Sequence, residues 1–402
     1  MRYHVPLFHF LLHYWTMKTT PRRFLLFGLF ISFLVLAFTT GIPNLAATHS
    51  YLAFVGTYTN KTDSKGIYAF QFDVDTGKLS EKGVAAQSPD PSWVVVHPNG
   101  KFAYAANEAG KQSTITAFAV DATTAKLSQL NQVPAQGEDP CHLSFDKTGK
   151  YLFAANYSSG TVAVFPIQPD GKLGEHTAAV KNAGELGPNK ERQEGPHAHW
   201  VEATANNKFV LVADLGLDRI LVYKFDSAKG TLAPNDPPAV KLAVGAGPRH
   251  VALAPNNKFL YVVSELNSTV TTYSFDANTG ASQQIHVVST LPGDYHGRND
   301  TAEIIVHPSG KWLFASNRGH DSIAVFSIDR ADGKLHAAGN FPTGGKEPRH
   351  FAIDPSGHFL LAENQNTNNI TVFKIDYATG ALTHVAGVDG IPSPVCIAFL
   401  AH

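Results

Sequence analysis

The chain has 402 residues, of which 44% are hydrophobic and only 16% are charged, and its formal net charge is −1. This composition is typical of a folded protein with a large core and excludes a disordered chain. A net charge near zero, without long runs of one sign, also excludes the basic surface expected of a nucleic-acid-binding protein. We therefore expect a small-molecule partner, and we expect no cofactor.

The first 47 residues differ from the rest of the chain. Three basic residues precede an apolar stretch from Phe24 to Phe38, and small or polar residues follow up to Ala47. This order is typical of a secretory signal, and the apolar stretch is shorter than the ~20 residues of a membrane span. We predict an exported protein, periplasmic or secreted, with a signal peptide over about 17–47 and Met17 as the true start. An uncleaved N-terminal anchor is the alternative.

From residue 48 onward, a turn followed by an aromatic strand recurs about every 50 residues, as in repeat proteins. Six copies of this pattern occur, at 99–107, 148–156, 206–214, 256–264, 309–317 and 356–364. An acidic turn at the end of a strand occurs seven times, from FDVDTGKLS at 72–80 to IDYATGALT at 375–383. Each unit has room for four short strands with Gly, Asn and Asp turns, which is typical of a β-propeller blade.

The difference between six and seven copies indicates how the ring closes. The first acidic turn is preceded by one apolar strand, YLAFVGTY at 51–58, and the last is followed by one, SPVCIAFL at 393–400. These two strands complete each other if they share a sheet. We predict an all-β, seven-bladed propeller over 48–402, with four-stranded antiparallel blades and a closing blade shared by both chain termini.

Cys141 and Cys396 are the only two cysteines. The repeat places them on blades two apart, which separates their Cα atoms by more than the ~7 Å that a disulfide tolerates. We therefore predict two buried free thiols, although an exported protein would permit a disulfide.

Functional positions are expected where the first strand of a blade begins and the second ends, because both lie around one mouth of the central channel. The first strands begin with Ser92, Cys141, His199, Arg249, Ala302 and Arg349. The next position holds Trp93, His142, Trp200, His250, Glu303 and His350. The second strands are followed by Glu108, Tyr157, Leu215, Glu265, Arg318 and Gln365.

Four residues depart most from the repeat at this rim, and they come from neighbouring blades: His199, Arg249, Glu265 and Arg318. They are our catalytic candidates. A carboxylate can activate water, an imidazole can act as acid or stabilise an oxyanion, and guanidinium groups can bind an anionic substrate. With Glu265 as the base, Glu265→Gln should abolish activity and leave stability nearly unchanged. The alternative is that Glu265 forms purely structural ion pairs.

Other polar residues near this rim are substrate-binding candidates, namely His197, His142, His250, Arg298, Asn299, Glu303, Asn317, His320, Arg349 and His350. His197 and His199 lie on one side of an extended strand, so either could be catalytic. The pair is compatible with a metal, but no third ligand has suitable spacing, and we expect none. Two long connections over the same rim, 174–198 and 281–302, could form lids; the first carries Arg192.

Three segments resemble the lactonase seven-bladed propeller family, which includes propeller-type 6-phosphogluconolactonases and a carboxymuconate cyclase. They are GPRHVALAPNNKFLYVVSELNSTVTTYSFD, AEIIVHPSGKWLFASNRGHDSIAVFSID and EPRHFAIDPSGHFLLAENQNTNNITVFKID. The resemblance covers about 50–400 and implies a seven-bladed fold with a site on the channel rim. The family's His, Arg, Glu and Arg fall on the four catalytic candidates.

The resemblance predicts a carboxylic-ester hydrolase that opens an anionic sugar lactone, as 6-phosphogluconolactonase does, by metal-independent acid–base catalysis. The alternatives are a muconate-type cycloisomerase using the same site and a non-catalytic propeller that binds a ligand. The predicted export leaves the substrate open, because phosphorylated sugar lactones are cytosolic metabolites.

Overall fold

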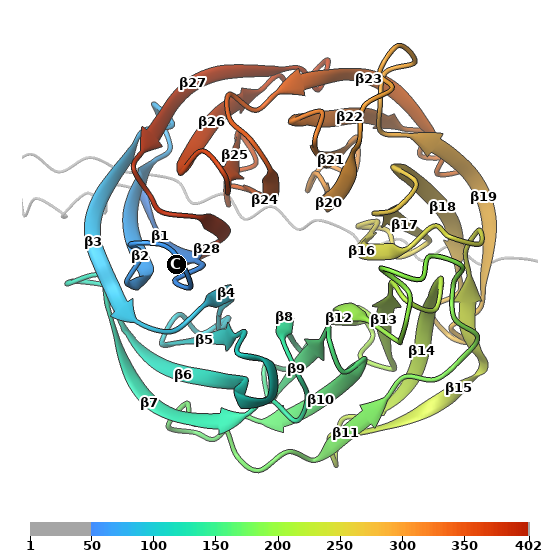
Figure 1. Ribbon diagram of the computed structural model, residues 1–402, viewed down its shortest axis with the longest axis horizontal. Helices are drawn as coiled ribbons and strands as arrows, with labels where there is room; N and C mark the ends of the chain where they lie inside the picture. The colour runs from blue at the N-terminus through green and yellow to red at the C-terminus, as the bar shows by residue number, and fades with distance from the viewer. Residues whose placement is uncertain (1–49, 401–402) are drawn as a thin grey trace, which may run out of the picture. The chain divides into compact units, whose positions relative to one another are not determined.

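The computed structural model describes residues 50–400, which form seven four-stranded antiparallel sheets around a central channel (Figure 1). The predicted all-β, seven-bladed propeller is therefore confirmed. The predicted signal peptide and the start at Met17 lie outside the described residues. Within those residues, no helix is long and apolar enough to cross a membrane.

The blades are numbered here from the first complete sheet, and blade 7 combines both ends of the chain. The innermost strands of blades 1 to 7 are β4 (Pro91–Val96), β8 (Pro140–Phe145), β12 (Ala198–Ala203), β16 (Pro248–Leu253), β20 (Asp300–Val306), β24 (Pro348–Ile353) and β28 (Pro394–Leu400). The second strands are β5 (Phe102–Asn107), β9 (Tyr151–Asn156), β13 (Phe209–Asp214), β17 (Phe259–Ser264), β21 (Trp312–Arg318), β25 (Phe359–Asn364) and β1 (Ser50–Thr57).

The third strands are β6 (Thr114–Asp121), β10 (Thr161–Pro166), β14 (Arg219–Asp226), β18 (Thr269–Phe275), β22 (Ser322–Ile328), β26 (Asn369–Ile375) and β2 (Gly66–Asp73). The outer strands are β7 (Lys126–Pro134), β11 (Ala178–Lys181), β15 (Thr231–Lys241), β19 (Ser282–Ser289), β23 (Leu335–Pro342), β27 (Leu382–Asp389) and β3 (Leu79–Gln87). A short 3-10 helix, Gly110–Gln112, lies between β5 and β6.

Blade 7 closes the ring by pairing the two ends of the described chain. Its strand order is β28-β1-β2-β3, and in the antiparallel β1–β28 pair Phe54 faces Ala398 and Val55 faces Ile397. This is the closure that the unmatched strands at 51–58 and 393–400 predicted. Closure gives each blade a neighbour on both sides and leaves few exposed sheet edges.

The core lies between neighbouring blades rather than in one central cluster. On β5, Ala103 and Ala105 pack into one inter-blade cluster, whereas Tyr104 and Ala106 pack into the next. Side chains of a strand alternate between the two faces of its sheet, so a strand between two blades must be apolar on both. This explains the runs of apolar and small residues in the second strands.

In several blades the channel rim is fixed by a polar side chain near the end of the second strand. Asn107 Nδ2 donates to the carbonyl of Pro89 at 2.6 Å, and Asn317 Nδ2 donates to the carbonyl of Thr290 at 3.0 Å. Each bond ties the strand end to the connection that arrives from the previous blade. The residue that follows is thereby held over the channel mouth.

Candidate active site

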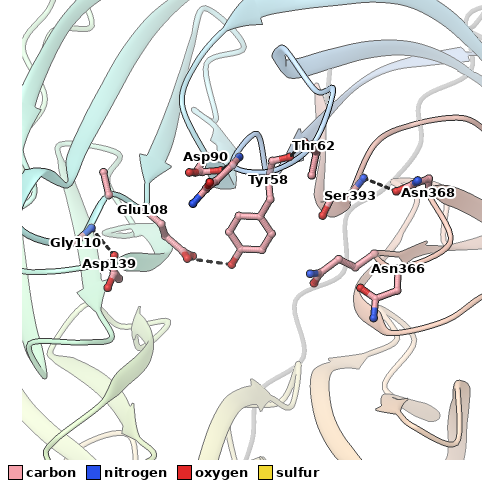
Figure 2. A pocket seen from close by; sticks show the side chains of 12 residues that line it. Tyr58, Thr62, Asp90, Glu108, Gly110, Asp139, Asn366, Asn368 and Ser393 are labelled. Carbon is pink, nitrogen blue, oxygen red and sulfur yellow. Dashed lines mark hydrogen bonds between the residues drawn. The ribbon is translucent and has the colours of Figure 1, made fainter.

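A cavity of about 260 Å³ lies at the channel mouth and receives residues from five of the seven blades. Its lining consists of Tyr58, Glu108, Asp139, Cys141, Tyr157, Ser158, His199 and Arg349. A larger, more open pocket of about 920 Å³ shares Tyr58, Glu108 and Asp139 with it, so the cavity continues outward over the rim (Figure 2).

Glu265 is the centre of a cluster of ion pairs beside this cavity. Its Oε2 atom lies 3.0 Å from Arg249 Nε and 2.9 Å from Arg318 Nη2, and its Oε1 atom pairs with Arg192. Burial raises the pKa of Glu265, whose side chain is 3% exposed, but the charges of these three arginines outweigh burial and lower the pKa to about 2. A carboxylate of this pKa is a weak proton acceptor.

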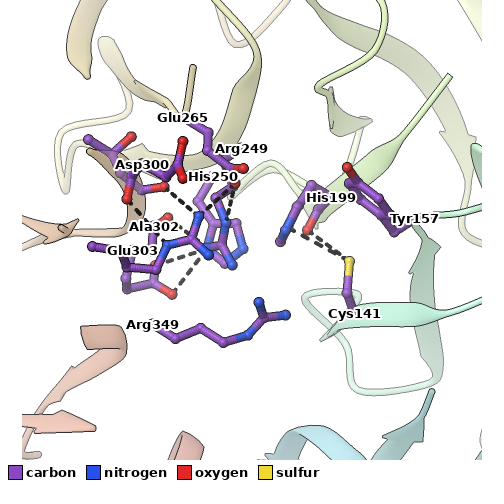
Figure 3. A network of polar contacts seen from close by, with 12 residues as sticks. Cys141, Tyr157, His199, Arg249, His250, Glu265, Asp300, Ala302, Glu303 and Arg349 are labelled. Carbon is purple, nitrogen blue, oxygen red and sulfur yellow. Dashed lines mark hydrogen bonds and ion pairs between the residues drawn. The ribbon is translucent and has the colours of Figure 1, made fainter. Parts of the chain in front are cut away.

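The arginines of this cluster are also bound to backbone. Arg249 Nη1 donates to the carbonyl of Ala302 at 2.8 Å (Figure 3), and Arg318 donates from Nε to the carbonyl of Asp300 and from Nη2 to that of Thr301, both at 3.2 Å. Burial and the charges of neighbouring arginines lower the pKa of Arg249 to about 9, so it remains protonated at neutral pH. The cluster is a rigid, positively charged wall.

His199 lines the cavity from the start of β12. Its Nδ1 atom lies 3.7 Å from Cys141 Sγ, and its ring packs 5.1 Å from the ring of His250 and 5.5 Å from that of Tyr157, measured between centroids (Figure 3). Burial, followed by the charge of Arg249, lowers the pKa of His199 well below its ordinary value. The imidazole is therefore neutral at pH 7, with one nitrogen able to donate and the other able to accept a hydrogen bond.

Arg349 reaches into the cavity from the start of β24 (Figure 3). Its guanidinium lies 5.4 Å from the centroid of the Tyr58 ring, and Nη2 lies 3.9 Å from Glu108 Oε1. Among the described residues it makes no hydrogen bond, and its side chain is 18% exposed. Unlike Arg249 and Arg318, it keeps its donors available for a ligand.

Three further histidine candidates fill the channel below the cavity. His250 Nδ1 lies 3.0 Å from Glu303, and His350 Nδ1 lies 2.7 Å from Glu363 Oε2. His142 packs at 4.4 Å from the ring of Trp93, and together with His350 it lines a separate pocket. Burial lowers the pKa of all three imidazoles, to about 4 in His350. These candidates and Glu303 thus form a buried axis of the ring, outside the lining of the cavity.

The structure separates His197 from His199. The His197 ring stacks on Tyr157 at 4.4 Å, its Nδ1 atom lies 3.0 Å from the carbonyl of Tyr157, and its Nε2 atom lies 3.1 Å from Glu194 Oε1. His197 therefore packs against Tyr157 and does not line the cavity, whereas His199 does.

The remaining candidates are structural parts of the blade 5 rim rather than cavity residues. Asn299 Nδ2 donates to Asn317 Oδ1 at 3.1 Å, and His320 Nδ1 lies 2.7 Å from Ser322 Oγ. The Arg298 side chain is 87% exposed and pairs with Asp300 at 3.0 Å. Their positions in the repeat placed these residues near the rim, but did not show that their side chains point away from the cavity.

Sequence reasoning missed Tyr58, Glu108 and Tyr157 as site residues. A signal was present for two of them, because Glu108 and Tyr157 occupy the repeat position that also holds Glu265 and Arg318. Arg192 lies in a connection predicted to cover this rim, and it does so by pairing with Glu265. Cys141 and Cys396 are both buried and unpaired, as predicted. Within 50–400, no group of three or more His, Cys, Asp or Glu residues is arranged to hold a metal ion.

The fold and the site define a seven-bladed propeller with a cavity at the channel mouth that combines an imidazole, a guanidinium and a carboxylate, those of His199, Arg349 and Glu108. The chain belongs to the lactonase seven-bladed β-propeller family, whose model matches residues 52–399. This confirms the family expected from the sequence.

Two curated relatives are similar along most of their length. The chain is 37% identical to a 6-phosphogluconolactonase of Bacillus subtilis over 350 residues, which cover 87% of this chain and 98% of the relative. It is 34% identical to a 6-phosphogluconolactonase of Formosa agariphila, with 75% and 85% coverage. Among solved structures, the periplasmic gluconolactonase of Pseudomonas aeruginosa has a TM-score of 0.82 and 30% identity, with 88% and 99% coverage. The chain is thus similar to hydrolases that act on lactones.

Proposed function

We propose that the protein hydrolyses an anionic sugar lactone, as a 6-phosphogluconolactonase does, in the cavity that His199 and Arg349 line. The observation that carries this proposal is the contrast among the guanidinium groups. Arg249 and Arg318 are held by Glu265 and by backbone carbonyls, whereas Arg349 faces the cavity, makes no hydrogen bond among the described residues and pairs only loosely with Glu108, at 3.9 Å. A free guanidinium in a confined site binds carboxylate or phosphate in a fixed orientation.

The arginine nearest the cavity supports an anionic substrate. Glu265 pairs with Arg192, Arg249 and Arg318, and Glu108 lies 3.9 Å from Arg349, whose guanidinium makes no hydrogen bond among the described residues. Such a guanidinium attracts an anion locally and also stabilises negative charge that develops on a carbonyl oxygen under attack by water. In this scheme the neutral His199 donates a hydrogen bond to that oxygen, without a metal.

Glu265 is the positioning residue of this site. The base role predicted from the sequence requires a free carboxylate, whereas both oxygens of Glu265 are engaged by arginines and its pKa is about 2. We therefore assign to Glu265 the alignment of Arg249 and Arg318, the residues that form the charged wall.

We also propose that the protein acts outside the cytoplasm. The predicted signal segment supports this, and so does the likeness to a periplasmic gluconolactonase. Cell fractionation followed by N-terminal sequencing of the mature protein tests it. A full-length protein in the cytoplasmic fraction would refute it.

The function is tested by incubating purified protein with 6-phosphogluconolactone, unphosphorylated gluconolactone and a carboxymuconate, and by following acid release above the spontaneous rate. We expect lactone opening with preference for the charged lactone. Cyclisation of the muconate alone would favour the cycloisomerase alternative. Saturable binding without any turnover would favour a non-catalytic propeller, and either result would reject the lactonase proposal.

A further inference from the structure

We infer that Glu108 is the general base of this site and that Tyr58 is its positioning residue. The inference rests on the proposed lactone hydrolysis and names the group that activates water. Glu108 lines both the 260 Å³ cavity and the larger rim pocket, so its side chain lies where the two join (Figure 2).

The Glu108 carboxylate is held in a defined position. Its backbone N–H donates to the carbonyl of Asp90 at 3.2 Å, and the Tyr58 hydroxyl donates to Oε2 at 3.0 Å (Figure 2). The bond joins the neighbouring blades 7 and 1 at the channel mouth. A base must be fixed in this way if it is to face the attacking water in every turnover.

The second carboxylate oxygen is the reactive one. Glu108 Oε1 is buried and has no hydrogen bond of good geometry from residues 50–400; the Ser92 hydroxyl interacts with the carboxylate and lowers its pKa, and Arg349 Nη2 lies 3.9 Å away. A buried carboxylate oxygen without a donor is costly, and a water molecule or substrate hydroxyl in the cavity would satisfy it. The unpartnered oxygen therefore lies beside the guanidinium that we assign to the substrate anion.

Glu108 and Glu265 have opposite electrostatic settings. Burial raises the pKa of Glu108, and the charge of Arg349 opposes this rise only in part, whereas three arginines lower the pKa of Glu265 to about 2. A base accepts a proton more effectively when its pKa is closer to the working pH. A substrate anion on Arg349 would weaken the opposing charge and make Glu108 more basic still.

The reaction balances with this single carboxyl group. Glu108 takes a proton from water while the water oxygen forms a bond to the lactone carbonyl carbon, and the carbonyl electrons move to the oxygen that His199 contacts. When the carbonyl re-forms, the bond to the ring oxygen breaks, and Glu108 returns its proton to that oxygen. The product is a hydroxy acid, which releases one proton to solvent at neutral pH.

The test is the pH dependence of lactone hydrolysis in Glu108→Gln. The wild-type rate should fall at acidic pH with a midpoint above the ordinary range of a glutamate, because protonated Glu108 is inactive. Glu108→Gln should lower kcat about 100-fold or more and should lose this acidic limb. Glu202→Gln is the matched control, since Glu202 pairs with Lys147 and lines a different pocket, and it should retain wild-type kinetics.

Tyr58→Phe provides an independent readout. The Tyr58 bond both stabilises the charged form of Glu108 and fixes its position, so its loss should move the acidic limb to higher pH and should also lower the rate at the alkaline plateau. If Glu108 merely joined two blades, this variant would lower stability without moving the limb.

The outcomes separate this inference from the proposed function. A wild-type protein that opens no lactone refutes both. A wild-type protein that is active, with Glu108→Gln retaining its kcat and acidic limb, overturns the role of Glu108 alone. Should Glu108→Gln fail to fold, an unmoved limb in folded Tyr58→Phe overturns the inference and a shifted limb supports it.

Discussion

Replacing Glu265 by Gln should destabilise the protein as well as alter its site. The substitution removes the negative charge that three guanidinium groups share, while Arg249 stays buried and Arg318 largely so. This differs from the nearly unchanged stability expected from the sequence, because sequence spacing alone did not reveal three simultaneous ion pairs.

The magnitude follows from the pKa. Lowering it from 4.5 to about 2 favours the ionised form in the folded state by roughly 3 kcal/mol, at about 1.4 kcal/mol for each pKa unit. Breaking a buried pair by removing one partner costs a similar ~3–5 kcal/mol. Because the pKa is lowered on folding, this stabilisation is present above pH 4.5 and is lost as the pH falls toward 2.

The assay is thermal and urea unfolding of wild type and Glu265→Gln at pH 7 and at pH 3. We expect a Tm several degrees lower for the variant at pH 7, with a smaller difference at pH 3. Glu185→Gln, in an exposed position of the connection that also carries Arg192, is the control and should leave the Tm unchanged. Equal Tm values for wild type and Glu265→Gln at pH 7 would refute the reasoning.

Three more predictions follow from the geometry. Arg349→Gln should raise KM for a phosphorylated lactone about 10-fold or more, the scale of a lost charge-assisted bond, and should change KM for a neutral lactone little; equal effects in steady-state assays would argue against anion binding by Arg349. Truncation before Pro394 removes β28 and should abolish cooperative unfolding in calorimetry, whereas an unchanged transition would mean that β1 does not need its partner. Burial raises the pKa of the Cys141 and Cys396 thiols, so iodoacetamide should label them only after unfolding, as mass spectrometry would show; rapid labelling of native protein contradicts this.

The fold could be predicted from the sequence because every blade has the same requirements for its strands and turns. Each second strand must be apolar on both faces, as on β5, and each turn needs Gly, Asn or Asp, so the pattern recurs in register along the chain. The strands at 51–58 and 393–400 each lacked a complete blade, and the ring closes only if they pair in one sheet. The structure shows this pairing between β28 and β1.

The site was predictable only in part. Comparing equivalent positions identified His199 and the arginines that surround Glu265, because charge at an otherwise variable position stands out. The same comparison passed over Glu108, since it favoured residues from neighbouring blades. A narrow channel also brings together blades that are not direct neighbours, so Glu108 of blade 1 and Arg349 of blade 6, on either side of blade 7, meet in one cavity. Such contacts depend on the diameter of the ring and on side-chain rotamers, and neither can be predicted from the spacing of residues in the sequence.

The closing blade has a consequence for the order of biogenesis. The innermost strand of that sheet, β28, follows every other strand of the propeller in the chain, whereas its partner β1 precedes them all. A nascent polypeptide therefore stays an incomplete circle, with the inner edge of β1 unprotected, until β28 has been synthesised.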